Sequence, residues 1–295
     1  MTAPQLSLET LQPVIVRVFP DLASGVFTAQ PRGWDSFAID VDGSLIFKFP
    51  RNDAARRRLA TEAALLAIVR PGVALPTPEM SLHDGTPYGG PPLFSRHAKL
   101  DGEHLEPAAY AALPEADRDR LAEDLARFYA ELHALPDARL AAAGAGPIQP
   151  WLAPGDILER AWPVLDAPLR RYAERTVAAW RALPPDPFGE TYGFFDGHGW
   201  NMAFDREAGR LNGVYDFGDS GFGQLQQEFI YANMISPDLA GRIIRRYATL
   251  TGRALDAERI ALLYQTLRLS ELAELAGDPE KGPIALAAVR ALAEP

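Results

Sequence analysis

The residues best suited to chemistry are two carboxylates and an amide in the second half of the chain. Asp196 and Asn201 stand in a D-x-x-x-x-N spacing, and Asp216 opens a D-F-G-D segment beyond a short turn. Phosphoryl transfer needs such a set, because one group orients the attacking hydroxyl and two oxygen ligands hold the magnesium that neutralises the phosphates. The order of the three residues predicts that chemistry.

Each of these residues alone also has an ordinary structural interpretation. Asp, Asn and Gly are common in turns, and an isolated Asp-Phe-Gly carries little information. Asp196 could cap a turn, Asn201 could bond its own backbone, and Asp216 could cap a helix. The three together at this spacing favour the functional interpretation.

The flanking sequence predicts elements that bring these groups together. The aromatic run 192–195 is typical of a short buried strand, and the glycine-containing segment 196–200 of a loop. Residues 201–204 and 211–215 form a predicted hairpin. The hairpin would return the second carboxylate to the side of the amide, so that two metal ligands distant in sequence become neighbours.

A second pair of chemical groups is predicted in the first hundred residues. Strands at 37–41 and 45–49 flank an Asp-Gly hairpin signal, and Lys48 lies on the face opposite to the aromatic residues of its strand. A helix over about 53–69 carries Glu62 and, packed behind the sheet, would bring it to Lys48. The ammonium would then contact nucleotide phosphates. A solvated glutamate and a snorkelling lysine are the ordinary alternative.

The length and the changes in composition predict two lobes. The chain has 295 residues, 47% of them hydrophobic, which is enough for two packed units. A first helix capped by Ser7, five short strands and one inserted helix predict a small α+β lobe over 1–99. Over 100–295 the sequence becomes rich in Ala, Leu and Arg and mostly helical. Later helices are expected at 157–183, 228–235, 239–251, 256–276 and 283–293.

Charge and residue usage narrow the class of protein. The net charge of −10 disfavours a nucleic-acid surface, which needs clustered cations, and is compatible with a cationic substrate. There is no cysteine, so no disulfide framework or thiolate chemistry is expected. The chain shows no signal peptide and no apolar stretch of membrane-spanning length, so a cytoplasmic protein without membrane contact is expected.

Taken in order, these features resemble the aminoglycoside phosphotransferase and choline kinase family, a branch of the protein-kinase-like fold. The resemblance covers nearly the whole chain, and its motifs occur in the family's order at sensible separations. They are Gly33-Trp34-Asp35-Ser36, Phe47-Lys48-Phe49-Pro50, Leu132-His133-Ala134-Leu135-Pro136, Asp196 to Asn201, and Val214-Tyr215-Asp216-Phe217-Gly218-Asp219.

The resemblance implies a bilobal α+β fold, with a mainly antiparallel β lobe and a larger, mostly helical lobe. It implies an enzyme that uses Mg²⁺ to transfer the γ-phosphate of ATP or GTP to a hydroxyl of a small molecule. Asp196 would be the catalytic base, and Asn201 and Asp216 the metal ligands. The implied nucleotide-binding residues are Lys48, Glu62, Ser36, Ile46 and, through hinge backbone groups, Arg96, His97 and Ala98.

Two segments depart from the family pattern. Phe194-Phe195 stands where the family has His-Gly, so the imidazole that braces the catalytic loop is missing. Gln224 replaces an aspartate and is expected to remove a charge near the site, while Glu228 is expected to take the structural role of a later aspartate. Because the base and metal positions are intact, an active enzyme is expected.

The acceptor is implied to lie against the helical lobe, near Asp219, Glu271 and Glu274. The two glutamates are three apart and share a helix face, which could equally be a solvated surface. An aminoglycoside-like antibiotic is the leading acceptor class. An amino alcohol, a sugar, a macrolide or another metabolite is the alternative, as is a nucleotide-binding pseudokinase. A protein kinase is disfavoured because little chain is left for an activation loop.

Overall fold

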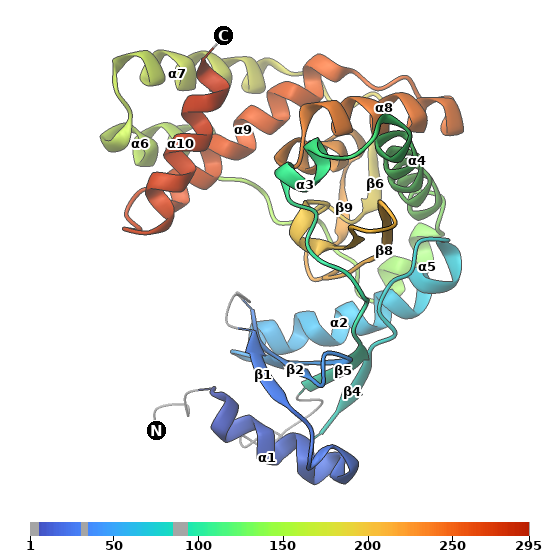
Figure 1. Cartoon of the computed structure of the whole chain (residues 1–295). Helices are drawn as coiled ribbons and strands as arrows, with labels where there is room; N and C mark the ends of the chain where they lie inside the picture. The colour runs from blue at the N-terminus through green and yellow to red at the C-terminus, as the bar shows by residue number, and fades with distance from the viewer. Residues whose placement is uncertain (1–5, 31–34, 85–93, 295) are drawn as a thin grey trace.

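The computed structural model describes residues 6–30, 35–84 and 94–294. A five-stranded sheet with two helices forms one end of the molecule, and helices with two small β ladders form the other (Figure 1). The elements at the sheet end are α1 (Leu8–Val18), β1 (Phe27–Gln30), β2 (Ser36–Val41), β3 (Leu45–Pro50), α2 (Asp53–Val69), β4 (Ser81–His83) and β5 (Phe94–Ala98).

The helical end follows from Pro107. Its helices are α3 (Pro107–Ala111), α4 (Glu115–Leu132), α5 (Asp137–Ala142), α6 (Pro154–Ala161), α7 (Ala167–Ala182), α8 (Pro237–Thr251), α9 (Ala257–Leu275) and α10 (Lys281–Ala293). Its strands are β6 (Glu190–Gly193), β7 (Met202–Asp205), β8 (Arg210–Val214) and β9 (Gly221–Gln224). Short 3₁₀ segments are η1 (Pro20–Leu22), η2 (Arg70–Gly72), η3 (Trp162–Val164), η4 (Gly199–Asn201) and η5 (Leu225–Met234).

The sheet has the order β1-β2-β3-β5-β4 and is antiparallel throughout. Its two faces are chemically different, because side chains alternate along each strand. One face packs Phe47, Phe49 and Phe94 against Leu11 and Ile15 of α1. Helix α2 lies on the opposite side of the sheet from α1 (Figure 1). The face that carries Lys48 is therefore the one available to α2 and to a ligand.

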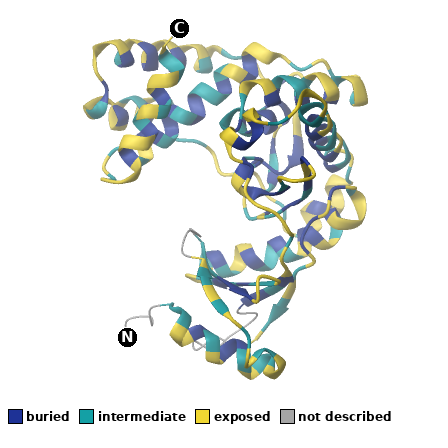
Figure 2. Ribbon diagram, in the orientation of Figure 1, coloured by how far each residue is buried: buried dark blue, intermediate teal, exposed yellow. Residues whose placement is uncertain are grey.

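Helix α2 belongs to both ends of the molecule. Asn52 caps its start by accepting from the Ala55 N–H at 2.9 Å. Near its end, Leu65, Leu66 and Val69 are buried in the main hydrophobic cluster, which continues through α4, β7, β8 and α8. A separate cluster joins α6, α7, α9 and α10. Figure 2 shows buried residues on the inward-facing sides of these helices and in the strands.

The structure corrects three sequence-based boundaries. The helix expected at 157–183 is two helices, α6 and α7, because Pro163 interrupts the pattern and Asp166 caps a new start at the Leu169 N–H. The helix expected at 228–235 is the 3₁₀ segment η5. The strand expected at 37–41 begins one residue earlier, at Ser36, which pairs with Pro50.

The predicted fold class is confirmed: the architecture is α+β, with a mainly antiparallel sheet and many helices. The predicted hairpin is β7 and β8, with the register Met202↔Val214. Within the described ranges, no helix is both long and apolar enough to cross a membrane. Gly33 and Trp34 of the first family motif lie outside the described residues.

Candidate active site

The loop that carries Asp196 is held at its start by a buried carboxylate. The expected strand 192–195 ends at Gly193, because Phe194 N and Phe195 N donate to the carboxylate of Glu228 at 2.7 and 2.9 Å. Phe195 consequently adopts a left-handed backbone with φ of 52°. A Cβ at Gly193 would lie 2.0 Å from Glu228 Oε2, so only glycine fits this approach.

Glu228 holds the start of this loop from a buried position. Its side chain is fully buried, and His133 Nε2 lies 3.6 Å from Oε2. His133 Nδ1 in turn hydrogen-bonds the Tyr247 hydroxyl at 2.9 Å, so both ring nitrogens of this histidine face buried structural groups. The structure therefore bears out a structural role for Glu228, but through the two N–H groups at the start of the loop.

Replacing Glu228 with glutamine is expected to destabilise the protein by about 2–3 kcal/mol, because a buried amide N–H₂ would then face a backbone N–H. The measurement is the free energy of unfolding in urea. Gln227→Glu, its neighbour on η5, is the control and should change stability little. An unchanged unfolding midpoint for Glu228→Gln would show that the brace is not energetically important.

Asp196 and Asn201 are linked directly. Asn201 Nδ2 donates to Asp196 Oδ2 at 2.6 Å and to the Asp196 carbonyl at 3.0 Å. His198 Nε2 lies 3.1 Å from Asp196 Oδ1. Because the amide nitrogen of Asn201 is engaged in this way, its side-chain oxygen remains available for a cation.

The hairpin returns the second carboxylate to this loop, as the sequence predicts. Tyr215 N donates to the Asn201 carbonyl at 3.0 Å, immediately before Asp216. Asp216 has a φ of 69°, an unusual backbone for a non-glycine residue and one that recurs at functional sites. Its Oδ1 lies 3.1 Å from Lys48 Nζ, which joins β3 of the sheet to the loop after β8.

The predicted contact between Lys48 and Glu62 is present. Lys48 Nζ lies 3.1 Å from Glu62 Oε1, and both side chains are largely buried. Glu62 also accepts from Phe217 N at 3.1 Å. Burial alone lowers the pKa of Lys48, but the charges of Asp216 and Glu62 outweigh it and raise the pKa overall. The ammonium is thus a fixed cation at the junction between the sheet and the catalytic loop.

The donor set suits magnesium bound together with phosphates. In the described part of the chain, no three His, Cys, Asp or Glu side chains converge as a metal cage. Asn201 and Asp216 instead offer one amide oxygen and one carboxylate, and Lys48 holds the pKa of Asp216 low. Magnesium commonly takes only one or two protein ligands and completes its octahedron with waters and substrate phosphates. These residues therefore fit a phosphate-bridging ion.

The predicted hinge residues lie on β5 beside Lys48. Ile46 pairs with His97 in the register, and both share the Lys48 face of the sheet. His97 Nδ1 donates to the Ala98 carbonyl at 2.8 Å, and burial lowers the pKa of His97 to about 4, so its ring is neutral at pH 7. Arg96 points to the other face, with its guanidinium 4.6 Å from the Phe19 ring centroid. Only the backbone of Arg96 can reach a nucleotide.

The acceptor-side carboxylates are not equivalent. Partial burial, and then the charges of Asp196, Asp216 and Asp35, raise the pKa of Asp219 to about 6, while its side chain stays accessible. Glu271 is partly buried and is paired with Arg268 at 2.6 Å. Glu274 is exposed on the same helix. Asp219 and Glu271 both lie close enough to Asp196 for its charge to raise their pKa, but Glu271 is less exposed and is also paired with Arg268.

Some groups near the site were not identified by sequence reasoning. His198, in the middle of the loop, bonds to Asp196. Burial, and then the charges of Asp196 and Glu228, raise the pKa of Tyr231 on η5. Ser95 pairs with Lys48 in the register, and its hydroxyl is buried without a hydrogen-bond partner among the described residues. The D-x-H spacing of Asp196 and His198 is the sequence signal from which the contact between them could have been predicted.

The expectation that Gln224 changes the charge of the site was wrong. Gln224 lies at the outer end of β9, and its Oε1 accepts from Arg259 at 3.0 Å. That arginine also donates to the Pro184 carbonyl at 2.9 Å. The strand carries residue 224 away from the carboxylates, so its contacts are structural.

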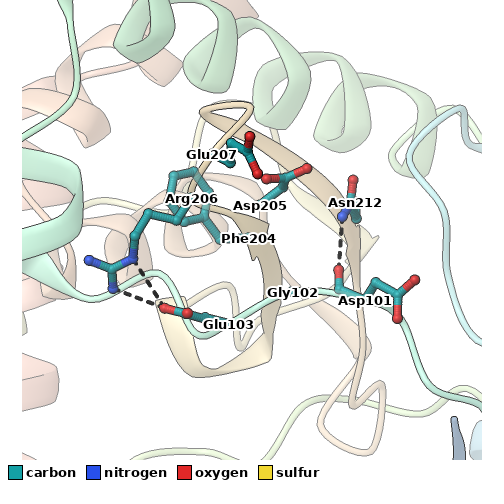
Figure 3. Close-up of a pocket in the computed structure, with 8 residues that line it drawn as sticks. All are labelled: Asp101, Gly102, Glu103, Phe204, Asp205, Arg206, Glu207 and Asn212. Atoms are coloured by element: carbon teal, nitrogen blue, oxygen red, sulfur yellow. Dashed lines mark hydrogen bonds and ion pairs between the residues drawn. The ribbon is translucent and has the colours of Figure 1, made fainter. Parts of the chain in front are cut away.

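A groove of about 440 Å³ lies outside this site, beside the linker between the two ends of the molecule (Figure 3). Glu103 and Arg206 form an ion pair of 2.9 Å across it, and Asn212 Nδ2 donates to the Asp101 carbonyl at 2.9 Å. None of the predicted site residues lines this groove. The groove is therefore separate from the candidate active site.

Several solved structures have the same fold. The GDP complex of wild-type aminoglycoside 2'-phosphotransferase-IIIa is 23% identical, with a TM-score of 0.81 over 98% of this chain and 99% of that chain. The GDP and kanamycin complex of APH(2'')-IIIa is 20% identical, with a TM-score of 0.79 over 95% and 97%. Macrolide 2'-phosphotransferase MphH from Brachybacterium faecium is 19% identical, with a TM-score of 0.66 over 98% and 99%.

At these identities the structural likeness establishes the fold. No curated protein sequence gives a significant match to this chain. The family model described as APH, phosphotransferase enzyme family, matches residues 27–263, which include every predicted catalytic, nucleotide-binding and metal position. The predicted family is confirmed, and the chain belongs to the phosphotransferase enzyme family.

Proposed function

We propose that this phosphotransferase transfers the γ-phosphate of ATP or GTP to a hydroxyl of a cationic small molecule, with an aminoglycoside-like antibiotic as the leading acceptor class. The observation that carries the proposal is the contact chain Glu62–Lys48–Asp216, which adjoins the Asn201–Asp196 pair. It combines a phosphate-binding cation, two metal ligands and a base in one place.

The nucleotide is assigned to the lobe 1–99 and the acceptor to the lobe 100–295. Lys48, fixed by Glu62, would bind the phosphates, and the backbone of β5 near Ala98 would meet the purine. Ile46 shares the Lys48 face and would lie against the base. Other structures of this fold hold GDP, ATP or ADP, which supports a purine nucleotide as phosphate donor.

Asp196 would orient the acceptor hydroxyl and take its proton as the phosphoryl group arrives. Its two carboxylate oxygens already accept from His198 and Asn201, so the side chain is held in one orientation before substrate binds. Magnesium held by Asn201 and Asp216 would supply neutralisation of the developing charge on the phosphates. Lys48 adds a second positive charge on the side of the sheet.

Negative charge around the base supports a cationic acceptor. Burial, and then the negative charges of Asp196, Asp216 and Asp35, raise the pKa of Asp219. Amino groups of an acceptor would relieve that repulsion. Solved structures of this fold contain kanamycin, streptomycin or gentamicin, and others of the same fold are named as macrolide kinases.

The test is nucleoside-diphosphate release with Mg·ATP and Mg·GTP across aminoglycosides, macrolides, amino alcohols and sugars. Release that depends on an aminoglycoside supports the proposal in full. Release with only a neutral sugar would contradict the cationic acceptor class but would still support kinase activity. Release with only a macrolide would contradict the leading class of aminoglycosides. Tight nucleotide binding without release for any acceptor would count against the proposed activity.

The affinity for a cationic acceptor is expected to fall below pH 6. The pKa of Asp219 is about 6, so the carboxylate becomes neutral as the pH falls through that value and loses its attraction for an ammonium. The acceptor KM should rise about 10-fold between pH 7.5 and pH 5. In Asp219→Asn the KM should be high at pH 7.5 and should change little with pH. An equal pH dependence in both proteins would assign the titration to another group.

A further inference from the structure

His198 is bonded on both nitrogens of its ring. Nε2 lies 3.1 Å from Asp196 Oδ1, and Nδ1 lies 3.2 Å from the Trp200 main-chain nitrogen. A backbone N–H can only donate, so Nδ1 must accept and carries no proton. The ring proton is therefore on Nε2, where it is donated to Asp196. Four-fifths of the side chain is shielded from solvent, which favours a persistent arrangement.

The same imidazole ring also caps the short 3₁₀ turn that carries Asn201, whose side-chain amide is a proposed metal ligand. His198 is the N-cap residue of η4, and its Nδ1 accepts from the N–H of Trp200, the second residue of that turn. Asn201 is the last residue of η4 and donates to the other oxygen of Asp196. One side chain is thus connected to the base directly and to the amide through a single turn of backbone.

We propose that His198 is a positioning residue that holds the Asp196 carboxylate, through its Nε2–H, in the orientation needed to receive the acceptor hydroxyl. Asn201 provides the second donor, so Oδ1 and Oδ2 are each restrained by one hydrogen bond. This inference rests on the proposed function, because it assigns Asp196 as the base.

The geometry separates this role from that of a proton relay. A relay would need a bare Nε2 facing Asp196, but that nitrogen carries the proton, and Nδ1 is occupied by the Trp200 N–H. The proton from the hydroxyl therefore stops at Asp196. His198 contributes orientation, and a small displacement of a reacting group is sufficient to slow a reaction about 100-fold.

Two conservative variants separate the two hydrogen bonds of the ring. His198→Gln places an amide N–H₂ near the position of Nε2 and retains the donor to Asp196. His198→Asn places an amide near the position of Nδ1, so it retains the cap on Trp200 N but loses the donor. His83→Asn, on the remote strand β4, is the control for loss of an imidazole.

The measurement is kcat and the nucleotide KM with the acceptor that the wild-type protein phosphorylates. His198→Asn is expected to lower kcat about 10- to 100-fold with an unchanged nucleotide KM, and His198→Gln to retain kcat within about 3-fold. The reverse order, with the asparagine variant active and the glutamine variant impaired, would make His198 a turn cap only and overturn the inference. Equal activity of both variants with the wild-type protein would overturn it as well.

A second readout does not depend on catalysis. Imidazole ¹⁵N shifts report which ring nitrogen carries a proton, and the resonance of His198 is assigned by its loss in His198→Asn. We expect a protonated Nε2 and a bare Nδ1 in the wild-type protein; a bare Nε2 would sink the proposal. If the wild-type protein phosphorylates no acceptor, the proposed function fails, while the ring assignment is still tested by this spectrum.

Discussion

Asp196→Asn is expected to lower kcat about 10³-fold with a change of less than about 2-fold in nucleotide affinity. Asparagine has the shape of aspartate but cannot accept the hydroxyl proton. Its amide nitrogen would also face either the Nε2–H of His198 or the Nδ2–H of Asn201, which both donate to the carboxylate. Lys48 and Glu62, the proposed nucleotide-binding groups, contact each other and not Asp196, so binding should persist.

The matched control is Asp205→Asn, at the end of β7. Asp205 Oδ1 accepts from Ala208 N at 2.9 Å, a turn contact that the asparagine oxygen can retain. Its turnover should equal that of the wild-type protein. Single-turnover rates and titration with a fluorescent nucleotide separate chemistry from binding. Near-normal turnover by Asp196→Asn would remove this residue from the mechanism as a base.

Asp216→Ala is expected to abolish the dependence of nucleotide binding on magnesium. The variant lacks the only carboxylate of the proposed donor set, and one amide oxygen from Asn201 is too weak to retain the ion. Lys48 loses one of its two ion pairs but keeps Glu62 at 3.1 Å, so the lysine should remain in place. Affinity for Mg·ATP should therefore fall to the value measured in excess EDTA.

Calorimetric titration of nucleotide with and without magnesium provides the measurement. Asp205→Ala serves as the control, because it removes a carboxylate from β7 without touching Lys48 or Asn201. Unchanged magnesium dependence in Asp216→Ala would mean that the ion is held elsewhere. A variant that also loses metal-free binding would instead point to displacement of Lys48, which the crystal structure of the variant would reveal.

The candidate site residues and their order could be predicted from the sequence, because phosphoryl transfer requires particular functional groups at a particular spacing. Lys48 and Glu62 were paired by strand alternation and helix placement, and the structure joins them at 3.1 Å. The hairpin that brings residues 201 and 215 together followed from a turn signal between two extended runs, and the Tyr215–Asn201 bond confirms it. Local chemistry was sufficient for these inferences.

Other features depended on contacts that no local pattern contains. The strand expected to reach Phe195 stops at Gly193 because a glutamate thirty-odd residues later binds two N–H groups of the loop. The carboxylates 271 and 274 share a helix face as predicted, yet Arg268 neutralises one and the other is exposed. Gln224 was expected near the site because of its position in the sequence. In the structure it lies at the far end of β9, where it accepts from Arg259.

By itself, the sequence determined the fold class and the family, and it predicted the base and metal residues, because these depend on residue type, order and periodicity. Only the tertiary structure decided which carboxylates remain unpaired near Asp196 and how that base is held. His198, Asn201 and Glu228 restrain the catalytic loop from three directions, through hydrogen bonds of 2.6 to 3.1 Å. Such bonds depend on the positions of atoms in space, and residues far apart in sequence contribute to them.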